Sequence, residues 1–215
     1  MEQTLKIWGA ETPRSFRPIW VAEELGLEYD HAPIQPRTGE TQTAEYTAMN
    51  GKQKIPLLEE GDFKLTESVA ICRYLIRNYP NDAIAVPQSK KELAREDEWI
   101  AYIYGELDET ALYVMRRHGE LSAIYGEAPA VMKSCAGYLK RHLAVLEPHL
   151  SKHDYVTQIG FSLPDVLLMS CLDWAAFYEI ELPESVQAYR ERIAQRPAYQ
   201  KAMQINFPIL FGGQS

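Results

Sequence analysis

The chain has 215 residues, of which 46% are hydrophobic and 24% are charged, and its formal net charge is −8. This composition is typical of a globular protein with enough apolar material for a substantial core. The acidic balance argues against a nucleic-acid surface, which needs a basic stripe, and against attraction to an anionic membrane. An anionic ligand would have to be captured by local groups, against the overall charge.

The sequence carries no signal for a membrane, a secretory route or a metal. No segment approaches the ~18 apolar residues that span a bilayer. The first residues, Met1–Lys6, lack a basic region followed by a long apolar core, so we expect no secretory signal and a cytoplasmic protein. The three cysteines lie far apart, without metal-ligand spacing, and are expected to be buried free thiols.

In chain order, the first elements are a strand, a helix and a second strand. Thr4–Trp8 alternates between apolar and polar residues and predicts a strand. Phe16–Leu25 predicts a helix that ends at Gly26, with Pro18 in its first turn, where the missing N–H is not needed. Tyr29–Ile34 predicts a second strand. Because a helix connects the two strands, we expect them to be parallel.

A polar segment with a short helix around Thr43–Met49 follows, and then the most informative stretch of the chain. Ile55-Pro56 precedes an apolar pair, and a proline at the start of a strand marks an edge or a bend. An X-Pro bond is also the place where a cis peptide costs little. The turn at Glu60–Asp62 joins two short apolar segments and predicts a hairpin.

The next segment, Thr66–Ser68, opens an apolar-periodic helix. The free N–H groups and the positive dipole end of a helix start attract an anion. A backbone edge beside such a start suits a small extended ligand with a carboxylate at one end. Each signal taken alone also fits an ordinary helix cap or an ordinary edge strand.

Together these motifs resemble the glutathione-binding half of a glutathione transferase: Ile-Pro-Leu-Leu, a Gly-Asp hairpin, then Glu-Ser-x-Ala-Ile-x-x-Tyr-Leu. The resemblance implies that the bond before Pro56 is cis and that the backbone of Ile55 pairs with the cysteinyl part of glutathione. It implies that Glu67 meets the α-ammonium of the γ-glutamyl group and that Ser68 holds its carboxylate. Glutathione is then a co-substrate, and no metal is expected.

The resemblance also implies a basic or amide side chain at the glycine carboxylate of glutathione. Gln53 and Lys54 precede Ile55 and are the candidates, with Lys52 and Arg37 as alternatives. A solvated surface lysine is the structural alternative for Lys54.

Beyond the first eighty residues, the sequence predicts helices alone. We expect residues 1–80 to form an α/β thioredoxin-like domain, 81–87 a linker and 88–215 an all-α helical bundle. The expected helices are Lys90–His118, Ala128–Lys152, Pro164–Tyr178, Ser185–Arg196 and one that starts at Pro197. Ser162–Asp165 predicts a capping box for the third and most apolar of these helices.

The family resemblance places the catalytic group just after the first strand. Against the serine-class pattern Ser-Pro-x-Ser-x-Arg-Val, Thr12 stands at the catalytic serine, and Ser15 is the other available hydroxyl. The Thr-Pro start also resembles a bacterial class that reduces disulfides with glutathione, although that class has Asn where Arg14 stands here. Such a hydroxyl stabilises the thiolate of glutathione. Either hydroxyl could instead cap the first helix.

The second substrate is expected between the domains, against the helix that begins at Lys90. Aromatic and basic residues on that helix suit a pocket for an apolar electrophile or a disulfide, and equally suit helix packing: Tyr102, Tyr104, Tyr113 and Arg116.

Three functions remain open from the sequence. The first is a cytoplasmic, homodimeric glutathione transferase-like enzyme that conjugates glutathione to an apolar electrophile or uses it to reduce a disulfide or a peroxide. The second is a transferase-like binding or interaction module without turnover, since a fold does not fix a function. The third, an oxidoreductase acting through its own cysteine, is disfavoured because the first loop contains no cysteine.

Overall fold

The computed structural model describes residues 4–211, which divide into two compact units. The described residues up to Ile84 and from Ala194 onward form the first unit, and Ala85–Ile193 form the second. The last helix of the chain therefore groups with the first eighty residues. The predicted limits of 1–80, 81–87 and 88–215 stay a prediction, and their first and last few residues lie outside the described part.

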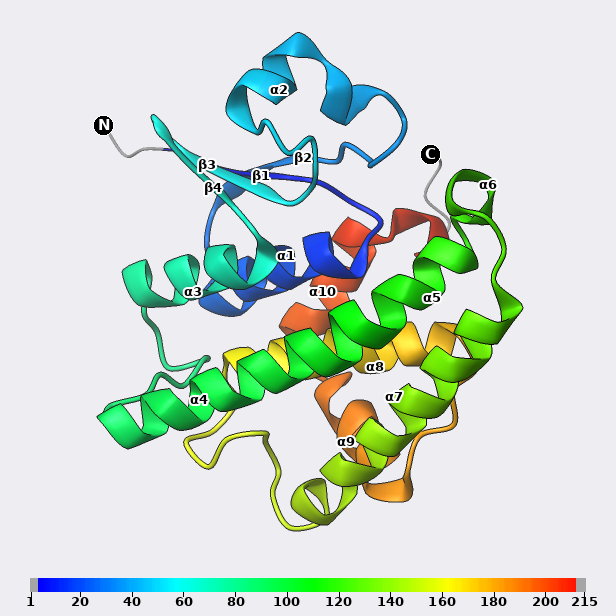
Figure 1. Ribbon diagram of the computed structural model, residues 1–215. Helices are drawn as coiled ribbons and strands as arrows, with labels where there is room; N and C mark the ends of the chain where they lie inside the picture. The colour runs from blue at the N-terminus through cyan, green and yellow to red at the C-terminus, as the bar shows by residue number, and fades with distance from the viewer. Residues whose placement is uncertain (1–3, 212–215) are drawn as a thin grey trace. The chain divides into compact units, whose positions relative to one another are not determined.

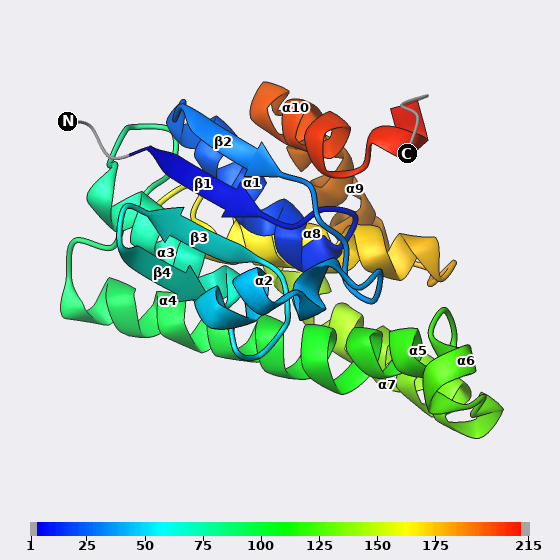
Figure 2. The same cartoon turned by 90° about the horizontal axis from the view of Figure 1, so that it is seen from above.

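The first unit contains a four-stranded mixed sheet in the order β2-β1-β3-β4 (Figure 2). Its strands are β1 (Leu5–Trp8), β2 (Tyr29–Ala32), β3 (Leu57–Glu60) and β4 (Phe63–Thr66). β1 pairs in parallel with β2, as the intervening helix predicts, and β3 runs antiparallel to both β1 and β4. The predicted hairpin is present, with Leu57 opposite Thr66.

Helices pack around this sheet. On one side lie α1 (Pro13–Leu25) and α3 (Ser68–Asn78), while η1 (Glu40–Gln42) and α2 (Ala44–Met49) lie on the other (Figure 1). α10 (Pro197–Asn206) packs along α1 and is followed by η3 (Pro208–Phe211). The sheet and these helices form the thioredoxin-like arrangement that the order of elements predicts.

The predicted start of α1 is wrong. The helix begins at Pro13 rather than near Ser15, because Thr12 is its N-cap and Pro13 takes the first helical position. Pro18 therefore lies inside the helix and not in its first turn. The predicted end is correct, since Gly26 adopts a left-handed conformation with φ of 66°.

The second unit is helical throughout. It contains α4 (Lys90–Tyr102), η2 (Ile103–Leu112), α5 (Tyr113–His118), α6 (Ser122–Tyr125), α7 (Pro129–Leu150), α8 (Leu163–Phe177) and α9 (Glu184–Ile193). The predicted helix Lys90–His118 is continuous, but η2 is a π-helical segment whose hydrogen bonds reach five residues back, as from Tyr113 to Asp108.

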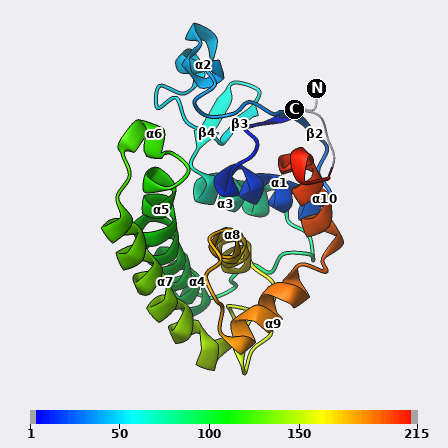
Figure 3. The same ribbon diagram turned by 90° about the vertical axis from the view of Figure 1, so that its right-hand side faces the viewer.

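α8 is the central helix of the second unit, as its apolar sequence predicts (Figure 3). The capping box is present: Asp165 Oδ2 accepts the Ser162 N–H at 2.9 Å. Asp165 also accepts the Tyr189 hydroxyl of α9 at 2.8 Å and the Val156 N–H at 2.8 Å. Burial raises the pKa of Asp165 to about 6 despite these donors. Among residues 4–211, no helix is both long and apolar enough to cross a bilayer.

Candidate functional site

The loop between β1 and α1 brings the two predicted catalytic hydroxyls together. Thr12 caps α1 by accepting the Ser15 N–H at 3.0 Å, and Ser15 Oγ accepts the Thr12 N–H at 3.2 Å. Their hydroxyl oxygens lie 2.9 Å apart. Ser15 is fully buried, whereas Thr12 retains 4% of its surface. Both residues therefore act as caps, and Thr12 is the one with residual exposure.

A third side chain completes this cluster, although no sequence motif indicates it. Asn206, the last residue of α10, is fully buried. Its Oδ1 accepts the Ser15 hydroxyl at 2.9 Å, and its Nδ2 donates to the Thr12 carbonyl at 3.2 Å. Its own carbonyl accepts the Glu11 N–H at 2.9 Å. Because 191 residues separate Asn206 from Ser15, no local pattern could reveal the contact.

The bond between Ile55 and Pro56 is cis, as the resemblance implies. Between residues 4 and 211, neither the N–H nor the C=O of Ile55 finds a hydrogen-bond partner. Gly9, at the end of β1, lies directly against this residue: a Cβ on Gly9 would come within 2.7 Å of the Ile55 Cβ. The backbone of Ile55 is therefore an unpaired edge held beside the β1–α1 loop.

The start of α3 combines an unusual backbone with a buried positive charge. Glu67 has φ of 73°, and its side chain does not cap the helix. Such a conformation costs a non-glycine residue about 1–3 kcal/mol and is often found at ligand sites. Arg17 of α1 is fully buried, and its Nη1 donates to Ser68 Oγ at 3.4 Å. The sequence analysis missed Arg17 as a site residue; its signal was an arginine within an apolar helix.

Two contacts therefore link the three predicted parts of the site. Gly9, which precedes the β1–α1 loop, lies closely against Ile55, and Arg17 of α1 donates a hydrogen bond to Ser68. A hydroxyl pair, an unpaired backbone edge and a helix start lie on adjoining segments of one unit. The buried guanidinium of Arg17 places a positive charge beside Ser68.

The residues before Ile55 are held by α2. The Lys54 carbonyl accepts the Tyr46 hydroxyl at 2.8 Å and the Asn50 amide at 2.7 Å. The Gln53 amide donates to Thr47 Oγ1 at 3.1 Å. Lys52, one of the alternatives to Lys54, instead points to Glu67, whose Oε1 lies 2.6 Å from its Nζ. Both side chains of that ion pair are more than half exposed, so a ligand can compete for Glu67 at small cost.

The predicted second-substrate residues all lie in the second unit. The Tyr102 hydroxyl donates to the His142 carbonyl of α7 at 3.1 Å, and burial raises its pKa to about 12. The Tyr104 hydroxyl lies 3.1 Å from Glu109 Oε1, and Arg116 Nε lies 3.6 Å from Glu120 Oε2. Tyr113 opens α5. Helix packing accounts for the position of Tyr102, and a role in substrate binding stays a prediction for all four.

The three cysteines differ in burial. Cys72 and Cys171 are buried, as predicted, but Cys135 is half-buried because it lies on an outer position of α7. Burial raises the pKa of Cys72 to about 12, although the charge of Arg17 partly opposes this. A thiol with such a pKa stays protonated and unreactive at neutral pH. Between residues 4 and 211, no group of acidic, histidine and cysteine side chains could hold a metal.

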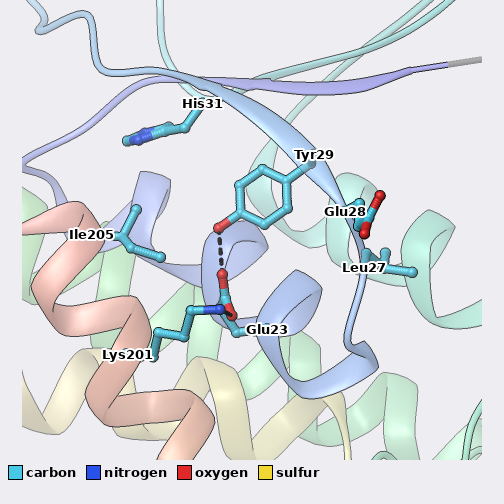
Figure 4. A pocket seen from close by; sticks show the side chains of 7 residues that line it. All are labelled: Glu23, Leu27, Glu28, Tyr29, His31, Lys201 and Ile205. Carbon is cyan, nitrogen blue, oxygen red and sulfur yellow. Dashed lines mark hydrogen bonds and ion pairs between the residues drawn. The ribbon is translucent and has the colours of Figure 1, made fainter.

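A separate hollow of about 390 Å³ lies beside β2, between this strand and the helices α1 and α10 (Figure 4). Three of its polar side chains bind one another. The Tyr29 hydroxyl donates to Glu23 Oε1 at 2.8 Å, and Lys201 Nζ lies 2.7 Å from Glu23 Oε2. Burial and the neighbouring carboxylate of Glu23 raise the pKa of Tyr29. None of the predicted site residues lines this hollow.

Comparison with known proteins identifies the family. Residues 3–77 match the model of the glutathione S-transferase N-terminal domain, and residues 87–197 match that of the C-terminal domain. The chain therefore belongs to the glutathione S-transferase family.

Individual relatives agree with this assignment. Glutathione S-transferase 3 of Zea mays is 28% identical over 211 residues, which cover 93% of each chain. A theta class glutathione S-transferase from Xanthomonas axonopodis pv. citri, solved with glutathione bound, is 28% identical, with a TM-score of 0.78 over 93% of this chain and 97% of that one. Elongation factor 1-gamma of Prunus avium is 27% identical over 91% of this chain but only 46% of its own length.

Proposed function

We propose that this protein is an enzyme that binds glutathione, lowers the pKa of its thiol and transfers the glutathionyl group to an apolar electrophile. In that reaction the thiolate sulfur forms a bond to an electrophilic carbon, the leaving group departs with the bonding electrons, and the thiol proton passes to solvent. The same thiolate can reduce a disulfide or a peroxide. The family assignment and a relative solved with glutathione bound support this proposal.

The single observation that carries the proposal is the unpaired backbone of Ile55 beside a charged helix start. In this proposal the N–H and C=O of Ile55 pair with the cysteinyl residue of glutathione, as a strand would at a sheet edge. No partner within residues 4–211 competes for these two groups.

The γ-glutamyl end of glutathione would bind at the start of α3. Ser68 offers its hydroxyl and N–H to the carboxylate, and Glu67 accepts the α-ammonium in place of Lys52. The fully buried Arg17, which donates to Ser68 Oγ, adds a positive charge behind the carboxylate. Charge-assisted hydrogen bonds of this kind are about twice as strong as neutral ones.

Thr12 is the better candidate for the sulfur. The Ser15 hydroxyl is fully buried and is bonded to Asn206, so it has no surface to offer a ligand. Thr12 as a residue retains 4% exposure, and its hydroxyl is bonded to another hydroxyl, which a thiolate can replace as its acceptor. A hydrogen bond to the thiolate favours ionisation of the thiol.

The glycine end of glutathione would lie near Gln53 and Lys54, whose backbone is anchored to α2. We propose that Lys54 meets the glycine carboxylate, because Lys54 directly precedes Ile55, whereas the side chain of Lys52 points to the start of α3. On the second unit, Tyr102, Tyr104, Tyr113 and Arg116 are the proposed contacts of an apolar electrophile. A homodimer in the cytoplasm completes the proposal, on the family resemblance.

The likeness to elongation factor 1-gamma favours a second candidate function. A chain of this fold also forms part of a protein that is not named for transferase activity. The second candidate is therefore a transferase-like binding or interaction module without turnover. It allows glutathione to bind at Ile55 and Ser68 but requires no acidification of the thiol.

The test separates these two candidates. Glutathione binding is measured by calorimetry, and thioether formation with an activated aryl halide is followed by mass spectrometry at neutral pH. The proposal expects binding together with a thioether yield well above the uncatalysed rate, and a strong loss of both in Ser68→Ala. Binding without any thioether or any reduction of a model disulfide would establish the module instead.

A further inference from the structure

The position of Asn206 gives it a role in the proposed reaction. Its side chain lies between the Ser15 hydroxyl and the Thr12 carbonyl, although it belongs to the far end of the chain. α10 is held firmly along α1: Arg196 makes two hydrogen bonds to Glu24, at 2.6 and 2.8 Å. Tyr199 stacks edge-on against Phe16, with ring centroids 5.5 Å apart. These contacts hold the start of α10 against α1, and at its other end Phe207 packs on Phe16 with ring centroids 6.0 Å apart.

The hydrogen bonds fix the orientation of the Asn206 amide. The Thr12 carbonyl can only accept, so the nitrogen of the amide must face it, at 3.2 Å. The amide oxygen therefore faces Ser15 Oγ at 2.9 Å and can only accept from it. The other close acceptor of the Ser15 proton is the Thr12 carbonyl at 3.0 Å. The Asn206 amide oxygen and the Thr12 carbonyl can only accept, so both are better acceptors of the Ser15 proton than the Thr12 hydroxyl, which also carries a proton.

Of the two hydroxyl protons, that of Thr12 is therefore the one that can change its acceptor. The Thr12 oxygen already accepts the Ser15 N–H at 3.0 Å, and the Ser15 oxygen accepts the Thr12 N–H at 3.2 Å. In the 2.9 Å contact between the two hydroxyls, Thr12 is then the donor. When a thiolate arrives, the Thr12 proton can turn to the sulfur while every other bond of the cluster stays in place.

We propose that Asn206 is a positioning residue for Thr12: by holding the Ser15 proton and the Thr12 carbonyl, it directs the Thr12 hydroxyl to the thiolate. This inference rests on the proposed function. It assigns to the last helix a part in thiol activation, acting through Ser15 and the loop backbone without touching the substrate. Loss of Asn206 would remove one of the two acceptors of the Ser15 proton and the amide donor to the Thr12 carbonyl, and would so loosen the loop that orients the Thr12 hydroxyl.

The test compares Asn206→Ala with Tyr199→Leu. The second variant weakens the packing of α10 on Phe16 and Trp20 but leaves every hydrogen bond of the cluster intact. In the free protein, amide hydrogen exchange is measured at Thr12 and Ser15. In the glutathione complex, the thiol pKa is measured from thiolate absorbance. Melting temperatures of both variants show how far each change destabilises the fold.

The expected result is specific to Asn206→Ala. Exchange at Thr12 and Ser15 becomes about five-fold faster, the equivalent of one lost hydrogen bond. The thiol pKa rises by roughly 0.7 unit, which is the same factor in the ionisation equilibrium. Tyr199→Leu should change neither the exchange rates nor the thiol pKa, even if it lowers the melting temperature as much as Asn206→Ala does.

Two results overturn the inference. Unchanged exchange or an unchanged thiol pKa in Asn206→Ala shows that the loop does not need this residue, and equal shifts in Tyr199→Leu reduce its role to packing. Failure of the proposed function is visible in the wild-type protein alone, as glutathione that binds with an unshifted thiol pKa or does not bind. That result removes the catalytic part of the inference, while the exchange measurement still decides the structural part.

Discussion

Replacement of Gly9 by alanine should damage the glutathione site through Ile55. Gly9 has φ of +117°, a conformation that side chains rarely adopt, and its Cβ would lie 2.7 Å from the Ile55 Cβ. Ordinary contacts begin at 3.4 Å, so Ile55 would have to move by roughly 0.7 Å. The neighbour is a β-branched carbon close to the backbone, and the main chain of Ile55 must therefore move with it.

The magnitude follows from the two hydrogen bonds proposed for Ile55. A shift of this size lengthens a bond of about 2.9 Å beyond the range of a real hydrogen bond. Each lost bond contributes about 1 kcal/mol, so the loss of both weakens glutathione binding by roughly 10- to 30-fold. The backbone strain at Gly9 further lowers the free energy of unfolding by about 1–2 kcal/mol.

Calorimetric titration with glutathione and urea unfolding test this prediction, with Gly26→Ala as the matched control. Gly26 also has a positive φ, of +66°, but an added Cβ there meets nothing within 4 Å. Gly26→Ala should therefore lose stability by a similar amount and bind glutathione normally. The reasoning is refuted if Gly9→Ala binds glutathione as tightly as the wild type, or if both variants lose the same affinity.

Three further predictions concern Arg17 and the start of α8. Arg17→Met should weaken glutathione binding about ten-fold in calorimetry, because the charge behind Ser68 is lost. The control is Arg77→Met, on an exposed position of α3, which should bind glutathione normally. Ser162→Ala should lower the free energy of unfolding by about 2–3 kcal/mol, whereas loss of an exposed cap costs ~1 kcal/mol. The reason is that the Ser162 hydroxyl is fully buried and is bonded to Thr157 and Asp165. An unchanged urea midpoint would contradict this. Asp165 has its pKa raised to about 6 and therefore binds its proton more tightly in the folded state than in the unfolded state. Its contribution to stability is present below about pH 4 and is lost as the pH rises through about 6. The effect amounts to at most roughly 3 kcal/mol. Urea unfolding across this range should show a pH dependence that Asp165→Asn lacks, and the same dependence in both proteins would disprove the cause.

Local patterns predicted most of the elements because local forces decide them. The alternation before Gly9 and the turn at Glu60–Asp62 predict strands that the sheet contains. The Ser162–Asp165 cap predicts the start of α8 within a residue. The Ile-Pro and Glu-Ser motifs predict the unpaired edge and the helix start, since each depends on backbone chemistry that a few residues specify.

The remaining features depend on contacts that no local pattern contains. Asn206 reaches Ser15 across 191 residues, and Arg17 reaches Ser68 across 51. The π-helical geometry of η2 leaves the helical spacing of apolar residues nearly unchanged, so periodicity alone predicts an ordinary helix. The start of α1 was misplaced because Ser15 is itself a plausible cap; the reciprocal bonds to Thr12 decide between the two.

The thiol pKa of bound glutathione, followed by thiolate absorbance across pH, tests the central claim most directly. The account predicts that the wild-type protein lowers this pKa by about 1–2 units relative to free glutathione. Thr12→Ser should retain the lowered value, because it keeps the hydroxyl, and Thr12→Ala should lose it while still binding. Glutathione bound with an unshifted pKa, or a lowered pKa that survives in Thr12→Ala, would contradict the account.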